Sequence, residues 1–219
     1  MADEPDLILT DINVRHLFAT PLIISEMPPE ISANINPRLA AMLLQKEKEV
    51  PGTKASNDGG WQSDDKILQW GGADIVAVVD AMRQMVNHIT LQLNQGVFQR
   101  CLLNWKISGW ANINRANNAN VAHIHPGAYW SAVYYVATDG SKDPAQGGAL
   151  KLFDPRGGLP LMYCPVLRMG MEGYMTAGNT ELHYPRAGQC VIFPSWLSHA
   201  VTPYRGAGER ISLAFNFSI

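Results

Sequence analysis

The stretch GERISLAFNFSI, residues 208–219, is the most informative part of this chain for its fold. From Ile211 onward, bulky apolar residues alternate with small or polar ones, which is the period of a β-strand with one buried face. Arg210 and Ser212 then lie on one face of that strand. An arginine can hold a carboxylate by two hydrogen bonds, and a hydroxyl beside it can bind the second oxygen. The stretch therefore predicts a strand that presents a carboxylate-binding pair.

Similar short runs fill the second half of the chain and are separated by clusters of Gly, Pro, Asn and Asp. They are LLNWKISGWANINR (102–115), SAVYYVAT (131–138), GALKLFD (148–154) and QCVIFP (189–194). Together they predict a β sandwich or a small barrel, covered on one side by helices from the first half of the chain.

The first half of the chain predicts one strand and two helices. Residues 16–27 are rich in β-formers and predict an early strand. Asn36 and Pro37 resemble the start of a helix that runs to about residue 48. Between 73 and 94, apolar residues recur at steps of three and four and predict a helix with one buried face: Ile75, Val79, Met82, Val86, Ile89 and Leu93.

Two Gly-rich segments are expected to form walls or lids of a site, namely 51–72 and 162–179. The first predicts a long irregular loop. Its two tryptophans, Trp61 and Trp70, are expected to anchor the loop by packing.

Length and composition limit the classes of protein. We expect residues 1–219 to form a single domain, with 1–96 supplying the strand, the helices and the long loop, and 97–219 supplying the β core. A net charge of −2 without a basic block argues against nucleic acid as a partner. Three widely spaced cysteines and no apolar stretch of membrane-spanning length favour a soluble protein of the reducing cytoplasm.

The motif VAHIHP places His123 and His125 on one face of a strand, if the segment is extended. Two imidazoles on one face can hold a divalent metal, but the pair alone is weak evidence. His199, beside another predicted strand, is the best candidate for a third ligand, and His183 is a competitor. The ordered set of H-x-H, His199 and then R-x-S is less easily explained by chance than the pair.

With this set, the chain resembles the iron- and 2-oxoglutarate-dependent oxygenases, in particular a group of small, uncharacterised members. The segments that carry the resemblance are GGWQSDD, HIHPGAYWSAVYYV, LKLFDPRG and VIFPSWLSHAVTPYRGAGERISLAFNF. The resemblance implies a mainly β protein with some α structure, in which N-terminal helices flank a double-stranded β-helix, also called a jelly roll or cupin-like fold.

The resemblance also implies a chemistry and a site. Fe(II) binds at the mouth of the core, and oxidative decarboxylation of the cosubstrate 2-oxoglutarate to succinate is coupled to hydroxylation of a substrate. The distal carboxylate of 2-oxoglutarate would pair with Arg210 and Ser212. Alternation along the strand places Tyr134 and Tyr135 on opposite faces, so only one of them faces the core. Tyr135 is our candidate to donate a phenolic hydrogen bond to 2-oxoglutarate, and the alternative is that it only packs in the core. The identity of the substrate, a small molecule or a protein side chain, does not follow from the resemblance.

One feature departs from the superfamily pattern, which has His-x-Asp or His-x-Glu where this chain has His-x-His. We expect His123, His125 and His199 to form a three-histidine site. Alternatively, only one of the first pair ligates, and Asp154 or a water completes the set.

Two other functions are compatible with the histidines. The first is a cupin-like three-histidine dioxygenase without 2-oxoglutarate, which would leave Arg210 and Ser212 without a role. The second is a binding protein in which the histidines are structural.

Overall fold

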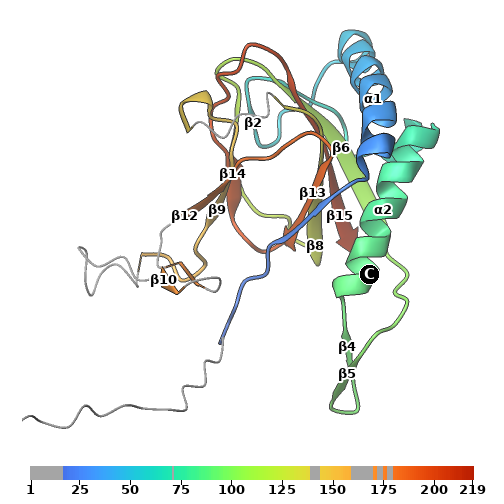
Figure 1. Ribbon diagram of the computed structural model, residues 1–219, viewed down its shortest axis with the longest axis vertical. Coiled ribbons are helices and arrows are strands. Elements are labelled where there is room, and N and C mark those ends of the chain that lie inside the picture. Colours follow the sequence, from blue (N-terminus) through green and yellow to red (C-terminus); the bar gives the residue numbers. More distant parts are fainter. Residues whose placement is uncertain (1–16, 71, 139–143, 159–169, 172–174, 177–179) are drawn as a thin grey trace, which may run out of the picture.

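The structure is a computed structural model that describes residues 17–70, 72–138, 144–158, 170–171, 175–176 and 180–219. Its centre consists of two antiparallel sheets that face each other, and both long helices lie against the outer side of one of them (Figure 1). The six-stranded sheet, called the major sheet below, has the order β1-β13-β8-β15-β6-β3. The five-stranded minor sheet has the order β12-β9-β14-β7-β2.

The elements of the two sheets come from distant parts of the chain. The major sheet contains β1 (Ile23–Glu26), β3 (Trp61–Gln62), β6 (Lys106–Asn114), β8 (Trp130–Ala137), β13 (Gln189–Pro194) and β15 (Arg210–Ser218). The minor sheet contains β2 (Asn57–Asp58), β7 (Ala119–His123), β9 (Leu150–Phe153), β12 (Thr180–His183) and β14 (His199–Val201). The remaining described elements are α1 (Pro29–Glu49), α2 (Ala73–Ile89), the 3-10 helices η1 (Ile67–Trp70) and η2 (Pro144–Gln146), and the hairpins β4 (Gln92–Asn94) with β5 (Val97–Gln99) and β10 (Gly170–Met171) with β11 (Met175–Thr176).

The expected jelly-roll core with flanking helices is confirmed, and the five predicted strand runs of the second half correspond to β6, β8, β9, β13 and β15. Strand β15 is central to the major sheet, because it pairs with β6 over nine residue pairs from Arg210↔Asn114 to Ser218↔Lys106 and with β8 on its other side. Strands β1, β2 and β3, which precede residue 97, extend the two sheets at their edges.

The alternation along β15 separates two environments. Ile211, Leu213, Phe215 and Phe217 belong to the apolar cluster that also contains the buried faces of α1 and α2. The residues between them face the minor sheet and line a pocket, as described below. Burial of each large apolar side chain contributes about 1.5–3 kcal/mol, so the side of the major sheet under the helices carries much of the stability of the fold.

The first helix starts earlier than predicted. It begins at Pro29, where a proline fits because the first helical N–H has no partner within the helix, and Pro37 lies inside it. Asn36 does not cap the helix, because its Oδ1 accepts a hydrogen bond of 2.6 Å from the hydroxyl of Tyr134. Asn36, which the sequence predicted at the start of the helix, therefore lies within the helix and contacts the major sheet.

The second helix ends earlier than predicted. The first four residues of its apolar stripe, Ile75 to Val86, are buried, but α2 ends at Ile89. Leu93 is exposed in the hairpin β4–β5, which projects away from the sheets (Figure 1). The helical spacing of apolar residues in the sequence therefore continues beyond Ile89, although the chain no longer packs against the major sheet there.

The N-terminal strand and the long loop also differ in extent from the prediction. Within the described part of the predicted strand, residues 17–27, strand structure covers Ile23–Glu26, where β13 provides a partner. The segment 51–72 contains β2, β3 and η1 in an otherwise irregular path. Trp61 is buried and its Nε1 donates to the carbonyl of Val50 at 3.0 Å, so the packing role expected for it is confirmed.

Candidate active site

The sheets bring His123 and His199 together. His123 is the last residue of β7 and His199 the first of β14, and the two are paired in register across the minor sheet. The Nδ1–H of His123 donates to the carbonyl of Val121 at 2.7 Å, and the Nδ1–H of His199 donates to that of Leu197 at 2.8 Å. A histidine whose Nδ1–H is held in this way presents the lone pair of Nε2 to a ligand.

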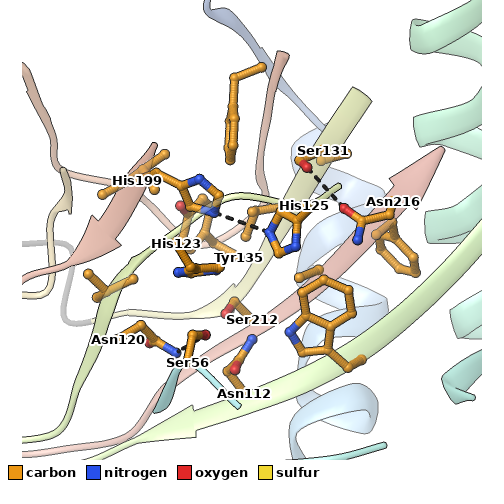
Figure 2. Close-up of a pocket in the computed structure, with 18 of the residues that line it drawn as sticks. Ser56, Asn112, Asn120, His123, His125, Ser131, Tyr135, His199, Ser212 and Asn216 are labelled. Carbon is orange, nitrogen blue, oxygen red and sulfur yellow. Dashed lines mark hydrogen bonds between the residues drawn. The ribbon is translucent and has the colours of Figure 1, made fainter. Parts of the chain in front are cut away.

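His125 lies just beyond the end of β7, so the pair does not share one continuous strand as expected. Its backbone N–H donates to the carbonyl of Ser195 at 3.0 Å, and its ring packs on Trp110 with centroids 5.3 Å apart. These contacts turn the ring back toward the other two histidines (Figure 2). The Nε2 atoms of His125 and His199 are 3.2 Å apart.

The three imidazoles fit a divalent metal. One ring nitrogen from each of His123, His125 and His199 lies within 4.8 Å of the other two. A separation of 3.2 Å is that expected of two nitrogens which share one ion at ligand distances of about 2.1 Å. Imidazole suits iron among other transition metals.

The burial of the cluster keeps the histidines neutral. Burial lowers the pKa of His199 to about 3, and burial with the nearby His123 lowers the pKa of His125 to about 4. Burial also lowers the pKa of His123. Metal binding requires a neutral imidazole, so the cluster is ready for a cation across the physiological pH range.

An inner pocket continues from the histidines into the space between the sheets and reaches Arg210. The other predicted cosubstrate residues, Ser212 and Tyr135, also line this pocket, and the two are neighbours in register on β15 and β8. Figure 2 shows Tyr135 and Ser212 pointing into the same space as the histidines. Tyr134, next along β8, points to α1 instead, as the alternation requires.

Arg210 is held in a fixed orientation. Only 3% of its surface is exposed, its Nε donates to the carbonyl of Gly148 at 3.0 Å, and its guanidinium carbon lies 5.2 Å from the ring centre of Tyr135. Burial raises the pKa of the Tyr135 phenol above its usual value, and the opposing influence of Arg210 is smaller. Tyr135 is therefore a protonated hydrogen-bond donor beside a buried cation.

The inner pocket also contains a polar atom that needs a partner. Oδ1 of Asn112 is buried and has no hydrogen-bond partner among the described residues. Beside it, the buried guanidinium of Arg210, the phenol of Tyr135 and the hydroxyl of Ser212 form a donor set that fits a dianion such as 2-oxoglutarate.

Other sequence candidates lie elsewhere. The carboxylate of Asp154 forms an ion pair with Arg156 at 2.7 Å, and neither residue lines the pocket. The Nε2 of His183 is 2.7 Å from Oε1 of Gln189. Of the two expected walls, segment 51–72 borders the site, whereas 162–179 lies largely outside the described residues.

An outer pocket of about 560 Å³ opens beside the histidines and contains residues to which the sequence interpretation gave no role in the site. Gln62, Asp64 and Asp65 line it from the segment 51–72, and Trp110 and Asn216 line it from β6 and β15. The alternation of side chains along a strand could have identified two of them. Trp110 shares a face with Asn112, and Asn216 shares a face with Arg210 and Ser212. No pattern in the sequence indicated that Gln62 pairs with Asn112 across β3 and β6.

The fold is shared with solved structures of low sequence identity. A Pseudomonas putida prolyl-4-hydroxylase superposes with a TM-score of 0.56 at 19% identity, covering 89% of this chain and 91% of that chain. A Trichoplax adhaerens prolyl hydroxylase, solved with a peptide fragment of hypoxia inducible factor, gives 0.55 at 13%, with 90% and 83% covered. The viral collagen prolyl hydroxylase of Paramecium Bursaria Chlorella virus-1, solved as a 2OG complex, gives 0.55 at 12%, with 90% and 96% covered.

Sequence comparisons complete the assignment. No curated protein sequence matches the chain. In the described part of the chain, none of the helices combines the length and the apolar character that crossing a membrane requires. Residues 108–216, which span β6 to β15 and include all three histidines and Arg210, match a family model described as "Putative 2OG-Fe(II) oxygenase". The chain therefore belongs to the 2OG-Fe(II) oxygenase family, whose cofactors are Fe(II) and 2-oxoglutarate.

Proposed function

We propose that His123, His125 and His199 hold the Fe(II) of this oxygenase as a neutral three-histidine ligand set. The observation that carries the proposal is the convergence of the three rings at the junction of the inner and outer pockets. The anchored Nδ1–H groups of His123 and His199 support it, because they direct both Nε2 atoms to one point. Three protein ligands leave positions on the ion for cosubstrate and oxygen.

We further propose that 2-oxoglutarate occupies the inner pocket. Arg210 and Ser212 would hold its distal carboxylate and Tyr135 would donate to it, while the keto acid end would reach the metal. When bound, iron and 2-oxoglutarate supply oxidative decarboxylation to succinate coupled to hydroxylation of a substrate. Because the guanidinium is buried and already oriented by Gly148, little of its freedom is lost when the carboxylate binds.

The walls of the site would protect this chemistry from water. The ring of Phe193 packs edge-on to His199 with centroids 4.7 Å apart, and Leu150 and Val133 close the inner pocket around Tyr135. Trp110 covers His125 from the other side. Substrate would then reach the metal through the outer pocket, whose volume suits a small metabolite or one protein side chain.

We infer a reducing compartment, the cytoplasm, as the place of action. Cys101 and Cys190 are free thiols, and Cys190 is buried. A reducing compartment preserves such thiols and also ferrous iron. Nucleic acid remains an unexpected partner, since the net charge is −2.

The test measures metal binding, 2-oxoglutarate binding and turnover separately. Anaerobic calorimetry should find one Fe(II) or Mn(II) per chain. Protein loaded with either metal should bind 2-oxoglutarate, and the Fe(II)-loaded protein should form succinate in air. His199→Ala should lower metal affinity by more than about 100-fold, which is the upper range for loss of a group behind a ligand. His183→Ala, a histidine outside the site, is the control.

Two results would contradict the proposal. Absence of 2-oxoglutarate binding in the metal-loaded protein would favour a cupin-like dioxygenase that uses no cosubstrate. Full metal affinity in His199→Ala, with the fold intact by circular dichroism, would remove His199 from the ligand set.

A further inference from the structure

The outer pocket has a charge opposite to that of the inner pocket. Asp64 and Asp65 line it, and none of its described lining residues is a lysine or an arginine. Neither carboxylate forms an ion pair with any residue that the structure describes. The inner pocket, in contrast, has Arg210 as the one lysine or arginine of its described lining and has no acid there.

The backbone holds the two acids at the rim of the pocket. The carbonyl of Asp65 accepts a hydrogen bond from the N–H of Gly109 at 3.2 Å, and the N–H of Ser63 donates to the carbonyl of Ala111 at 3.0 Å. Asp64 Oδ1 accepts from the N–H of Lys66 at 3.2 Å, which leaves its other oxygen without a partner in the described structure. The segment is therefore fixed to β6, and its carboxylates stay at the entrance.

A second, independent feature indicates a ligand that donates hydrogen bonds. Gln62 lines the outer pocket and only 7% of its surface is exposed, yet its Oε1 has no hydrogen-bond partner among the residues that the structure describes. The register pairs Gln62 with Asn112 across β3 and β6, so both side chains project from the same face of the major sheet, toward the site. A buried acceptor without a donor costs about 1–3 kcal/mol, and an N–H of a bound molecule would remove that cost.

Trp110 joins this acceptor surface to the metal site. It lines both pockets, and its ring packs on His125. An indole face attracts ammonium and guanidinium groups. A chain that carries such a group can thus lie along Trp110 with its cation near Asp64, Asp65 or Gln62 and an aliphatic carbon near the histidines.

We propose that the substrate carries a protonated amine or guanidinium on an aliphatic chain, as lysine and arginine do, and that Asp64, Asp65 and Gln62 bind this group in the outer pocket. The inference rests on the proposed function, because it takes the histidines as the metal site. The opposite charges of the two pockets then sort the ligands. Arg210 attracts the dianionic cosubstrate and repels the basic substrate, and the acids of the outer pocket do the reverse.

The experiment measures binding of defined probes to the protein loaded with Mn(II) and 2-oxoglutarate. The probes are free lysine, Nα-acetyl-lysine amide, Nα-acetyl-arginine amide and the uncharged isostere Nα-acetyl-norleucine amide. Calorimetry should show at least one basic probe binding on the order of 10-fold more tightly than norleucine amide. Free lysine against its blocked amide distinguishes a free metabolite from a residue within a peptide.

Variants then locate the binding. Asp64→Asn with Asp65→Asn should reduce affinity for the basic probe on the order of 10-fold and make it less sensitive to salt, while affinities for Mn(II) and 2-oxoglutarate stay unchanged. Gln62→Leu should weaken the basic probe more than norleucine amide. Asp80→Asn on α2, a partly exposed acid outside both pockets that pairs with Arg83, changes the net charge equally per residue and should have no effect on probe binding.

The outcomes separate the two proposals. Equal affinity for basic and neutral probes, no binding of any probe, or unchanged affinity in the double variant would overturn the inference while metal and 2-oxoglutarate still bind. Failure of the unmodified protein to bind metal or 2-oxoglutarate would instead overturn the proposed function, and the inference with it.

Discussion

The two faces of the major sheet can be compared along a single strand, β15. On one face, Ile211, Leu213 and Phe215 are buried in the apolar cluster under the helices. On the other face, Arg210 and Ser212 are equally buried but line the inner pocket. Burial alone therefore does not separate structural residues from those with a proposed function. What each face contacts does separate them. One face packs against side chains of the helices, and the other lines an enclosed space with hydrogen-bond donors arranged around it.

The largest expected effect comes from a substitution on the face of β15 that packs under the helices, which leaves the residues of the site unchanged. Leu213→Ala should lower the free energy of unfolding by about 2–5 kcal/mol, because Leu213 is fully buried and its loss leaves a cavity. Urea unfolding measures this, with Ser218→Ala at the end of the same strand as a control expected within about 0.5 kcal/mol. The folded fraction should keep its affinity for 2-oxoglutarate. If that affinity falls in the folded protein, the two faces are not independent.

The second prediction concerns a substitution on the face of β15 that lines the inner pocket. Arg210→Lys keeps the positive charge but removes the planar pair of donors, so affinity for 2-oxoglutarate should fall by about 1.5–3 kcal/mol, or about 10- to 150-fold. Calorimetry on the Mn(II)-loaded variant measures the loss. Arg38→Lys on α1, an exposed arginine paired with Asp74, is the matched control. Unchanged affinity in Arg210→Lys would favour the dioxygenase without a cosubstrate.

The third prediction concerns the stability of the metal-free protein, and its effect per pH unit is the smallest of the three. The folded pKa values of His199 and His125 are about 3 and about 4, below the ordinary value near 6.5. The unfolded chain then binds more protons below pH 6.5, so acidification from 6.5 toward 4 should destabilise the fold, and the loss is absent above 6.5. His199 contributes at most about 1.4 kcal/mol per pH unit, and the less buried His125 contributes less.

A variant isolates the contribution of His199 to this slope. The free energy of unfolding of the metal-free protein is measured by urea titration between pH 7 and 4.5, beside that of His199→Gln. The variant should show a shallower dependence on pH. Parallel curves would mean that His199 is protonated at the same pH in both states.

Much of the fold was predictable because alternation is a local property. The five strand runs and the apolar stripe from Ile75 to Val86 required only the periods of strand and helix. The errors lie where a distant partner decides the outcome. Asn36 bonds to Tyr134 and lies within a helix, and Leu93 continues the helical period but lies in a hairpin. Strand β3 exists because β6 offers an edge to Trp61 and Gln62.

For the site, the sequence by itself determined the chemistry of the donors: three imidazoles, one arginine and a hydroxyl on a strand face, in an order that resembles a known family. Only the tertiary structure decided the geometry. It placed His125 against His199, excluded Asp154 and His183 from the pocket, and brought Gln62, Asp64 and Asp65 to the entrance. The physical reason is that residue type and strand period are written in the chain locally, whereas the pairing of β7 with β14 and of β3 with β6 depends on contacts between segments far apart in sequence.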